Sequence, residues 1–248
     1  MAQTRSSQHH PALYPLWGIM VIMIIVHVAF WMKTRDFQSR WTNVPPAPSI
    51  LTAAGAGLGD PAIAYRTHGV MLQNMGDTGG RVSNLKAYNY ERLGKWFKLM
   101  HHLDPQSNFM PFLASFYFGS VKDSEKLRPL VNYLELAGNS PEGKKWRWLA
   151  HGAYLAQFDM KDYDLALRLA TKLANLGKED LPMWARNMRA SILNADGEKE
   201  AAYNMLLGIL EDGAKEMHPN EVNATVAYIC EQILTLQQAT DNPLCKDL

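Results

Sequence analysis

The residues with the clearest covalent chemistry in this chain are its two cysteines, Cys230 and Cys245. A cysteine serves as a nucleophile, a metal ligand or half of a disulfide, and its surroundings decide between these roles. Cys230 lies on the apolar face of a predicted helix, which favours a buried thiol or a disulfide partner over a nucleophile. Neither thiol has a cysteine or histidine companion at the spacing of a zinc site. The two cysteines can pair in an oxidising compartment, and two unlinked thiols are the alternative.

Histidines, carboxylates and serines offer no catalytic grouping either. His101 and His102 are adjacent, so on a helix they point in different directions, which suits packing and capping better than metal binding. Asp162 and Asp164 fall at a predicted helix start, where carboxylates cap the helix and suit its dipole. The G-x-S-x-G turn of a serine hydrolase does not occur. We therefore predict no catalytic residue, no metal site and no cofactor, and we expect a protein that is not an enzyme.

Two glycine-rich stretches, residues 53–60 and 76–81, raise the question of a nucleotide-binding loop. The first follows a proline-rich stretch, whereas a dinucleotide loop requires a preceding apolar strand. The second lacks the lysine and the Ser/Thr of a phosphate loop. We interpret the first as a flexible hinge that ends at a helix N-cap, and the second as a turn.

The densest basic and aromatic cluster is Lys144–Trp148, with the sequence KKWRW. If Trp148 faces the core, Trp146 points about 200° away around the same helix. An exposed Trp146 beside Arg147 would have the composition of an interaction hot spot. The alternative is that Trp146 packs against the preceding helices.

Two arginines on the equivalent helix one repeat later, Arg186 and Arg189, extend this cluster into a basic stripe. The stripe predicts a protein partner that carries an acidic or carboxylate-terminated segment. Nucleic acid is not an expected partner, because 25 Lys and Arg residues are balanced by 24 Asp and Glu residues. Phosphate binding requires a basic excess on one face.

Residues 13–32, LYPLWGIMVIMIIVHVAFWM, are twenty residues without a formal charge. As a helix this run is about 30 Å long, the thickness of the hydrocarbon core of a bilayer. Trp17 and Trp31 lie near its ends, where their rings favour the lipid–water interface. The apolar run is too long for a cleaved signal peptide. A buried helix of a soluble core is the other alternative, and we discount it because the run is apolar on every face, whereas surface helices show a polar stripe. We predict one uncleaved transmembrane helix, in which His27 is the one polar residue inside.

Different features of the sequence favour opposite orientations of this helix in the membrane. Arg5 precedes it while Lys33, Arg35 and Arg40 follow it, so a count of basic residues favours a cytoplasmic C-terminal domain. A short tail followed by one anchor is, however, the usual layout of a domain exported across a bacterial inner membrane. A pair of cysteines also suits the oxidising periplasm. We favour the periplasmic side.

Beyond the anchor, the pattern predicts an all-α chain. The N-terminal tail covers residues 1–12, and a linker rich in Pro and Gly covers residues 33–60 and favours extended geometry. Asp60-Pro61 is a good helix start, with a carboxylate cap and a proline in the first turn. Period-2 alternation is almost absent after it, so we expect close to no sheet. We place a helical repeat domain at 61–218 and a capping helix with a tail at 219–248.

An internal repeat of about 36 residues organises the soluble part. Shifting the sequence by this period aligns a column of small or aliphatic residues, Gly94, Leu130, Ala166 and Ala202. It also aligns an aromatic column, which we expect to dock into the neighbouring helices: Phe112, Trp148 and Trp184. Units of this kind are pairs of helices that stack into a solenoid. First helices are expected at 107–119, 143–157 and 182–194, second helices at 88–103, 124–137, 161–176 and 197–212, with flanking helices at 61–75 and 219–239.

The clearest unit is Trp148-Leu149-Ala150-His151-Gly152-Ala153-Tyr154-Leu155 followed by Asp162-Tyr163-Asp164-Leu165-Ala166-Leu167, and it resembles a tetratricopeptide repeat (TPR). The resemblance covers about 88–213. It departs from the family in its period, 36 rather than about 34 residues, and in a glycine column that retains only Gly152. The resemblance implies a degenerate, membrane-anchored TPR-like α-solenoid of bacterial type. Such proteins generally act as scaffolds that bind peptides or partner helices in a concave groove.

Two functions fit these features. The first is a non-enzymatic scaffold or adaptor that binds a protein partner through the repeat domain. The second is an accessory subunit of a membrane enzyme or an envelope-assembly complex. In that case the transmembrane helix itself makes specific contacts through Gly18, His27 and the face of Met20 and Met23.

Overall fold

The protein folds almost entirely into helices. The computed structural model describes residues 13–35, 44–78, 81–141, 143–177, 181–213 and 217–246. In this part of the chain the two strands, β1 (Asp77–Thr78) and β2 (Arg81–Val82), have two residues each and pair antiparallel. The prediction of an all-α protein is therefore confirmed at the level of fold class. The tail predicted at residues 1–12 lies outside the described residues.

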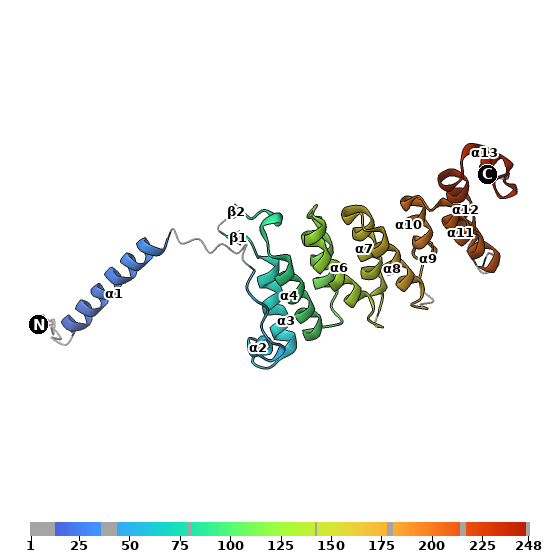
Figure 1. Cartoon of the computed structure of the whole chain (residues 1–248). Helices are drawn as coiled ribbons and strands as arrows, with labels where there is room; N and C mark the ends of the chain where they lie inside the picture. Colours follow the sequence, from blue (N-terminus) through green and yellow to red (C-terminus); the bar gives the residue numbers. More distant parts are fainter. Residues whose placement is uncertain are drawn as a thin grey trace, which may run out of the picture.

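Helix α1 (Leu13–Thr34) stands apart from the other helices (Figure 1). Its segment Pro15–Thr34 is the one helix in the described residues that is long and apolar enough to span a membrane, and none of it is buried against the chain. Trp17 and Trp31 are exposed, and the guanidinium of Arg35 lies 5.8 Å from the centre of the Trp31 ring. By its length and composition this helix could span a bilayer, and the described residues do not cover it.

The described end of the predicted linker differs from a flexible hinge. Residues 50–55 form a short helix, α2 (Ile50–Gly55), which Ser49 caps through its side chain. Val44 is fully buried, and Arg92 and Trp96 donate hydrogen bonds of 2.9 and 2.8 Å to the carbonyls of Val44 and Pro45. The proline-rich stretch is thus extended, as predicted, but it is bound along helix α4 (Tyr90–Leu103) instead of free. An extended proline-rich backbone makes no internal hydrogen bonds, so its carbonyls are free to accept hydrogen bonds from Arg92 and Trp96.

The glycine cluster at 76–81 forms the start of a small hairpin after helix α3 (Pro61–Gln73). Gly76 has φ +89°, and a Cβ atom there would collide with the Tyr88 hydroxyl. That hydroxyl donates a hydrogen bond of 2.7 Å to the Met75 carbonyl. Only glycine fits at position 76, so Gly76 has a structural reason that does not involve phosphate.

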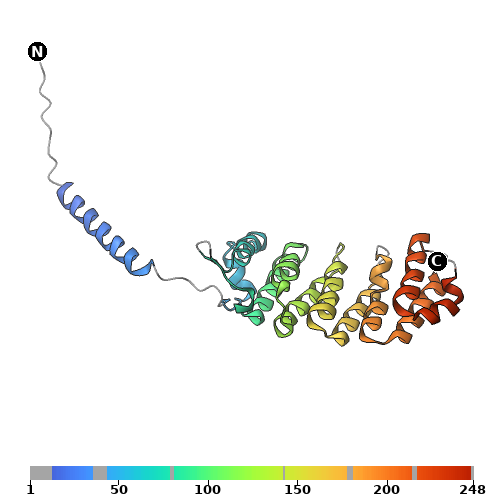
Figure 2. The ribbon, with the colours of Figure 1, turned by 90° about the horizontal axis from the view of Figure 1, so that it is seen from above.

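The remaining helices stand side by side in one row from α3 to α12 (Figures 1 and 2). We name them by their order in successive pairs. The leading helices are α3, α5–η3 (Phe109–Ser120), α7–η4 (Trp146–Met160), α9 (Met183–Arg186) with α10 (Met188–Asp196), and α12–η5 (Pro219–Ile233). The trailing helices are α4, α6 (Ser124–Gly138), α8 (Tyr163–Ala174) and α11 (Lys199–Gly213). Most of these bounds lie within a few residues of the predicted ones.

Local sequence explains where three of the trailing helices begin. Asn89, Asp123 and Asp162 precede α4, α6 and α8, and each side chain accepts a hydrogen bond from the backbone N–H three residues ahead. This contact satisfies one of the N–H groups that the first turn leaves unpaired. The predicted capping role of Asp162 is confirmed.

Two separate hydrophobic cores hold the row together. The larger core runs from Val44 to Ile192, and its largest fully buried side chains include Tyr133, Phe97 and Phe118. The smaller core joins α10 to the C-terminal helices through residues such as Leu206 and Ile229. The smaller core defines a C-terminal unit, from Ala190 to Leu244, with its own interior.

The C-terminal helix predicted at 219–239 is interrupted. The helix that begins at Pro219 ends at Ile233, and α13 (Leu236–Asp241) starts anew with Thr235 and Gln238 in a reciprocal capping box. A capping box satisfies N–H groups at a fresh helix start, which explains the break. Beyond α13 the structure joins Cys230 to Cys245 in a disulfide with Cα atoms 5.8 Å apart. This bond fastens the end of the chain to η5 (Ile229–Ile233), the last part of α12–η5.

Candidate partner-binding surface

Trp146, predicted as an exposed hot spot or as a packed side chain, is buried. Its exposed fraction is 4%, and its ring lies 5.8 Å from that of Trp184 and 5.6 Å from the guanidinium carbon of Arg147. The exposed alternative is therefore wrong. Trp146 is packed, as the alternative predicted, but its ring contact among the described residues is with Trp184 on the following leading helix and not with a preceding helix. Trp146 starts α7 directly after a turn, which places its ring between two neighbouring units.

The neighbouring lysine of this cluster also turns inward. Lys145 is buried, and its Nζ donates hydrogen bonds of 2.8 and 2.6 Å to the carbonyls of Gln106 and Ser107. A buried ammonium requires such partners, since desolvation of an unpaired charge is costly. Trp148 is half-buried and donates through Nε1 to the Asn108 side chain at 2.8 Å. The cluster thus ties α7 to the loop before α5.

The three predicted arginines lie in different surroundings. Arg147 and Arg186 are exposed, whereas Arg189 is half-buried and its Nε has no hydrogen-bond partner among the described residues. The two exposed arginines keep their mobile charges available to a partner. Arg189 is less suited to that role, because its side chain is partly enclosed.

The aromatic column expected to dock into the neighbouring helices is largely exposed. Phe112 and Trp184 each expose more than half of their surface, 55% for Trp184. The column was predicted to be interior from its period alone, and that prediction is wrong for these two residues. Period identifies residues in equivalent positions but does not tell which face of the pair meets solvent.

The exposed aromatic residues form a continuous series of ring contacts, which we call the aromatic ladder. Along it the ring centres are 5.1, 4.6, 5.7 and 4.7 Å apart. The members, from α5–η3 to α7–η4, are Phe112, Phe116, His151, Tyr154 and Phe158. The four phenyl and phenol side chains are each about half exposed. Aromatic rings at such distances attract one another, and the ladder spans two leading helices.

Sequence spacing contains a signal for part of the ladder. Phe112 and Phe116 are four residues apart, as are Tyr154 and Phe158, so each pair lies on one face of its helix. No spacing links Phe116 with His151, because they belong to different units. That contact follows from how the leading helices pack.

Exposed large apolar side chains gather on the leading helices. Among the residues between Pro61 and Ile233 whose exposure the structure describes, nine such residues are on leading helices and one, Leu136, is on a trailing helix. The nine are Ile63, Val70, Phe109, Phe112, Phe116, Tyr117, Tyr154, Phe158 and Trp184. Singly exposed apolar residues are normal, but their concentration on the leading helices, with the aromatic ladder as a continuous part, is typical of an interaction surface.

The trailing helices carry inter-helix ion pairs instead. Glu135 on α6 pairs with Arg168 and Lys172 on α8, with N–O distances of 2.8 and 3.0 Å. These contacts lower the pKa of the Glu135 carboxyl, chiefly through the Arg168 hydrogen bond. Arg128 pairs with Asp162 across the same two helices at 3.0 Å. Ion pairs thus join α6 to α8 on the trailing side of the row.

The one titratable base in the ladder favours its neutral form. Burial lowers the pKa of His151, and the nearby Asp159 opposes this shift only in part. Asp159 itself is paired with Lys122. A neutral imidazole keeps the ladder uncharged near pH 7, so the surface suits an apolar or aromatic segment.

A groove of about 440 Å³ lies farther along the leading helices, between α9–α10 and α12. Met183 and Trp184 form one side, Tyr228 forms part of the other, and Leu206 contributes from α11. Asn187 donates to the Thr225 hydroxyl at 3.2 Å within it. The joint between these leading helices is thus an open groove whose exposed lining is mostly apolar, with the Asn187–Thr225 hydrogen bond inside it.

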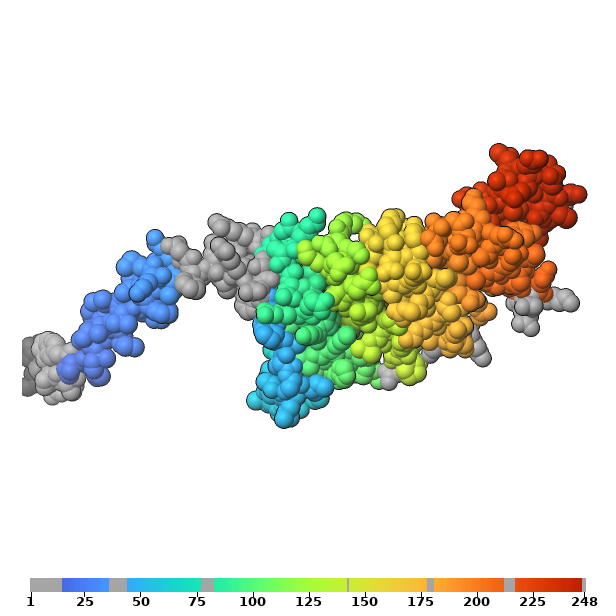
Figure 3. All heavy atoms as spheres, viewed as in Figure 1, coloured from blue at the N-terminus to red at the C-terminus, as the bar shows by residue number. Residues whose placement is uncertain are grey.

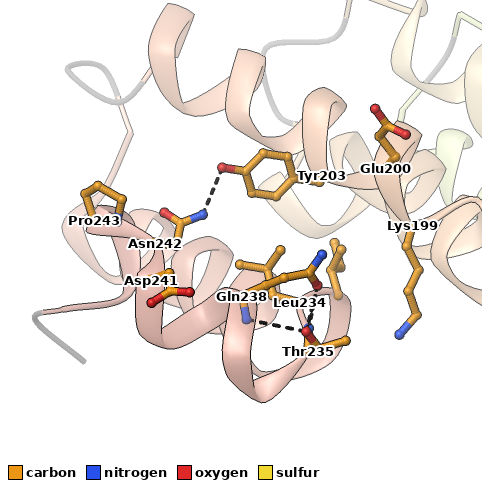
Figure 4. A pocket seen from close by; sticks show the side chains of 10 residues that line it. Lys199, Glu200, Tyr203, Leu234, Thr235, Gln238, Asp241, Asn242 and Pro243 are labelled. Carbon is orange, nitrogen blue, oxygen red and sulfur yellow. Dashed lines mark hydrogen bonds between the residues drawn. The ribbon is translucent and has the colours of Figure 1, made fainter.

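A second pocket, of about 840 Å³, lies between the start of α11 and the C-terminal tail (Figure 4). The side chains that line it mostly serve the fold: Asn242 donates to the Tyr203 hydroxyl at 3.0 Å, and Thr235 bonds Gln238 at 2.9 Å. No group of three potential metal ligands occurs in the described part of the chain.

Comparisons with protein families, with curated proteins and with solved structures find no match to this chain. The exposed surface of the leading helices is therefore the main indication of function.

Proposed function

We propose that this protein is a membrane-anchored, non-enzymatic scaffold that binds a protein partner along its leading helices. The observation that carries the proposal is the one-sided distribution of exposed apolar side chains, with the aromatic ladder at its centre. Water-exposed phenyl rings lose unfavourable hydration when a partner covers them. Helix α1 would hold this surface at a bilayer.

A TPR-like solenoid is the arrangement we propose for the row of helices. Its support is the sequence resemblance, together with helix bounds that alternate between leading and trailing helices near the predicted positions. In a solenoid of helix pairs, equivalent helices line a single elongated surface. A partner segment that is long and narrow fits such a surface.

The partner that we propose combines apolar anchors with an acidic or carboxylate-terminated end. The apolar anchors would cover the uncharged ladder. The exposed guanidinium groups of Arg147 and Arg186 lie on the leading helices on either side of the Trp146–Trp184 contact. Carboxylates are the natural partners of guanidinium groups.

The test is co-purification from native membranes in mild detergent, quantified by mass spectrometry. The double variant Phe116→Ser/Tyr154→Ser should lower partner recovery by at least about tenfold, since truncating a central aromatic anchor commonly has this effect. Leu136→Ser is the matched control, because Leu136 is an exposed apolar residue on a trailing helix. Equal recovery with the ladder variant and the control would refute the proposal.

Charge reversal tests the chemistry of the partner separately. Arg147→Glu/Arg186→Glu should weaken capture, and the loss should shrink at high salt because exposed charges are screened. Unchanged capture at low salt would refute the acidic segment of the partner. It would leave the apolar anchors that cover the aromatic ladder.

An accessory-subunit function is the second candidate, favoured by the full exposure of α1. None of its membrane-spanning segment is buried in the chain, so every face is open to lipid or to other membrane helices. Replacing α1 with an unrelated anchor separates the candidates. Retained partner recovery supports the scaffold, and lost recovery supports specific contacts by residues such as Gly18 and His27.

We propose a periplasmic position for the helical row, with support from the disulfide between Cys230 and Cys245. Disulfides persist in oxidising compartments and are rare in the cytosol. A C-terminal reporter that is active only in the periplasm tests this side of the membrane. Activity of a cytoplasm-specific reporter would place the row on the other side.

A further inference from the structure

The soluble residues with the greatest apolar exposure in the N-terminal half lie on and after α2. Leu58 is 97% exposed and Leu51 is 85% exposed, with Ile50 half exposed beside them. We call these three residues the apolar tip. A single exposed leucine is ordinary, but three exposed aliphatic side chains on α2 and the turn that follows it give this short segment an apolar surface that the described residues do not cover.

The backbone of this turn holds Leu58 outward. Leu58 has φ +55°, a left-handed conformation that a leucine rarely adopts. It stands between Gly57, where a Cβ atom would lie 2.4 Å from the Asp60 carbonyl oxygen, and Gly59, with φ +91°. A backbone that places a bulky apolar residue in a disfavoured conformation and full exposure suggests a role for that residue.

The apolar tip is fixed to the helical row. Arg92 and Trp96 hold the carbonyls of Val44 and Pro45, and the Nε2 atom of His68 lies 3.2 Å from the Ala53 carbonyl oxygen. Ala53 itself is buried. The tip therefore keeps its position relative to α3 and α4, so a contact made by the tip also constrains the position of the row.

The chain keeps this end of the row close to α1. Eight residues, 36–43, separate Arg35 from Val44. The nine Cα–Cα steps from Arg35 to Val44 therefore span at most about 32 Å. The view in Figure 3 shows α2 protruding from the end of the row that the chain joins after α1. No Asp, Glu, Lys or Arg occurs from Trp41 to Gly59.

From these observations we infer that the apolar tip inserts into the interfacial layer of the same bilayer that α1 spans. This inference rests on the membrane anchor of the proposed function. Leucine side chains enter a lipid interface without needing a complementary pocket, and α1 ensures that lipid is always within reach. The tip and α1 would then form two points of attachment, which would fix the tilt of the helical row against the membrane.

The experiment uses the full chain in lipid nanodiscs, with a nitroxide label on a single introduced cysteine. The test variants are Leu51→Cys and Leu58→Cys. The control is Leu236→Cys, because Leu236 is a leucine of similar exposure, 91%, on the C-terminal unit. The native cysteines are joined to each other, and intact mass verifies one label per chain. Collision rates with oxygen, which partitions into lipid, and with a polar nickel complex, which does not, report the surroundings of each label.

The expected result is a severalfold higher ratio of oxygen to nickel collisions at Leu51→Cys and Leu58→Cys than at Leu236→Cys. Equal ratios at all three positions in disc-bound protein would overturn the inference and leave the scaffold proposal intact. Labels that become shielded only in native membranes, and not in lipid discs, would also overturn it, since they would indicate a protein cover. Failure of the full chain to enter discs would refute the anchor and the inference together.

Discussion

At the scale of single residues, two tryptophans that lie in contact differ in how much of their surface is exposed to solvent. Trp146 and Trp184 touch, yet one is 4% and the other 55% exposed. The indole N–H of Trp146 has no hydrogen-bond acceptor among the described residues. Trp146 thus contributes to the interior at the cost of an unpaired donor, while Trp184 offers a free edge beside the groove between α9–α10 and α12.

This difference predicts that the two truncations destabilise the protein to different extents. Trp146→Ala should lower the free energy of unfolding by about 3–5 kcal/mol, as expected for a large buried ring. Trp184→Ala should lower it by no more than about 1.5 kcal/mol, the upper range for an aromatic pair. Chemical denaturation of the detergent-solubilised chain measures both values. A larger loss for Trp184→Ala would contradict the assigned burial.

His151 should make stability depend on pH in a direction that follows from its burial. Its folded-state pKa is lowered below the ordinary value of 6.5, so the unfolded chain takes up the proton first. The free energy of unfolding should therefore fall as the pH drops below about 6.5, until the folded state is protonated as well. His151→Phe keeps the ring contacts and should flatten the dependence.

Denaturant unfolding between pH 7.5 and 5 measures this effect. His101 adds a contribution of the same sign in both proteins, because burial, His102 and Lys145 lower its pKa as well. The informative quantity is thus the difference in slope between the wild type and His151→Phe. Identical slopes would show that His151 is not desolvated in the folded chain.

At the scale of elements, the closest helix crossings depend on particular small residues. A Cβ atom on Gly138, at the end of α6, would lie 2.5 Å from the Leu149 nitrogen on α7. Gly152, the residue that carries the TPR resemblance, has room for a Cβ atom at ordinary contact distances. The glycine that the packing requires is therefore not the one that the family pattern singles out.

Two alanine substitutions make this point measurable. Gly138→Ala should lower the free energy of unfolding by about 1–3 kcal/mol, because α6 and α7 must move apart. Gly208→Ala, in α11, meets no atom within 4 Å and should raise it by about 0.5–1 kcal/mol through helix propensity. Thermal unfolding followed by circular dichroism gives the order of the two variants. A stabilised Gly138→Ala would mean that the crossing is looser than described.

At the scale of the whole molecule, the protein consists of an isolated apolar helix and a row with two cores. The C-terminal unit has the smaller core and is fastened by the bond between Cys230 and Cys245. Regions with few buried apolar contacts open more readily than the rest of a protein. The disulfide offsets this weakness by restricting the unfolded tail.

Reduction should therefore loosen one end of the row selectively. Closing a loop of this length is worth about 3 kcal/mol in the chain-entropy description, so amide exchange in α12 to η6 (Pro243–Cys245) should accelerate. Exchange in α4, α6 and α8 should stay unchanged, because the larger core does not include the tail. Hydrogen exchange with and without reductant measures this. The variant Cys230→Ser/Cys245→Ser should show the fast exchange without reductant, and uniform acceleration along the row would contradict two separate cores.

Local sequence determined the features of this protein that depend on one segment at a time. An uncharged run of twenty residues, caps such as Asp60 and Asp162, and helical periodicity each act within a single helix, so α1 and most helix bounds were predictable. Cys230 and Cys245 were a possible pair, but their spacing alone left free thiols open.

Tertiary structure decided everything that depends on which helix covers which. It buried Trp146, exposed Phe112 and Trp184, bound the proline-rich stretch to α4 and brought His151 to Phe116. A helix pattern assigns side chains to faces, but the exposure of a face is fixed only by its neighbours. For the same reason the spacing of Phe112 and Phe116, and of Tyr154 and Phe158, indicated only the parts of the aromatic ladder within one helix, and the exposure of the apolar tip was not predicted.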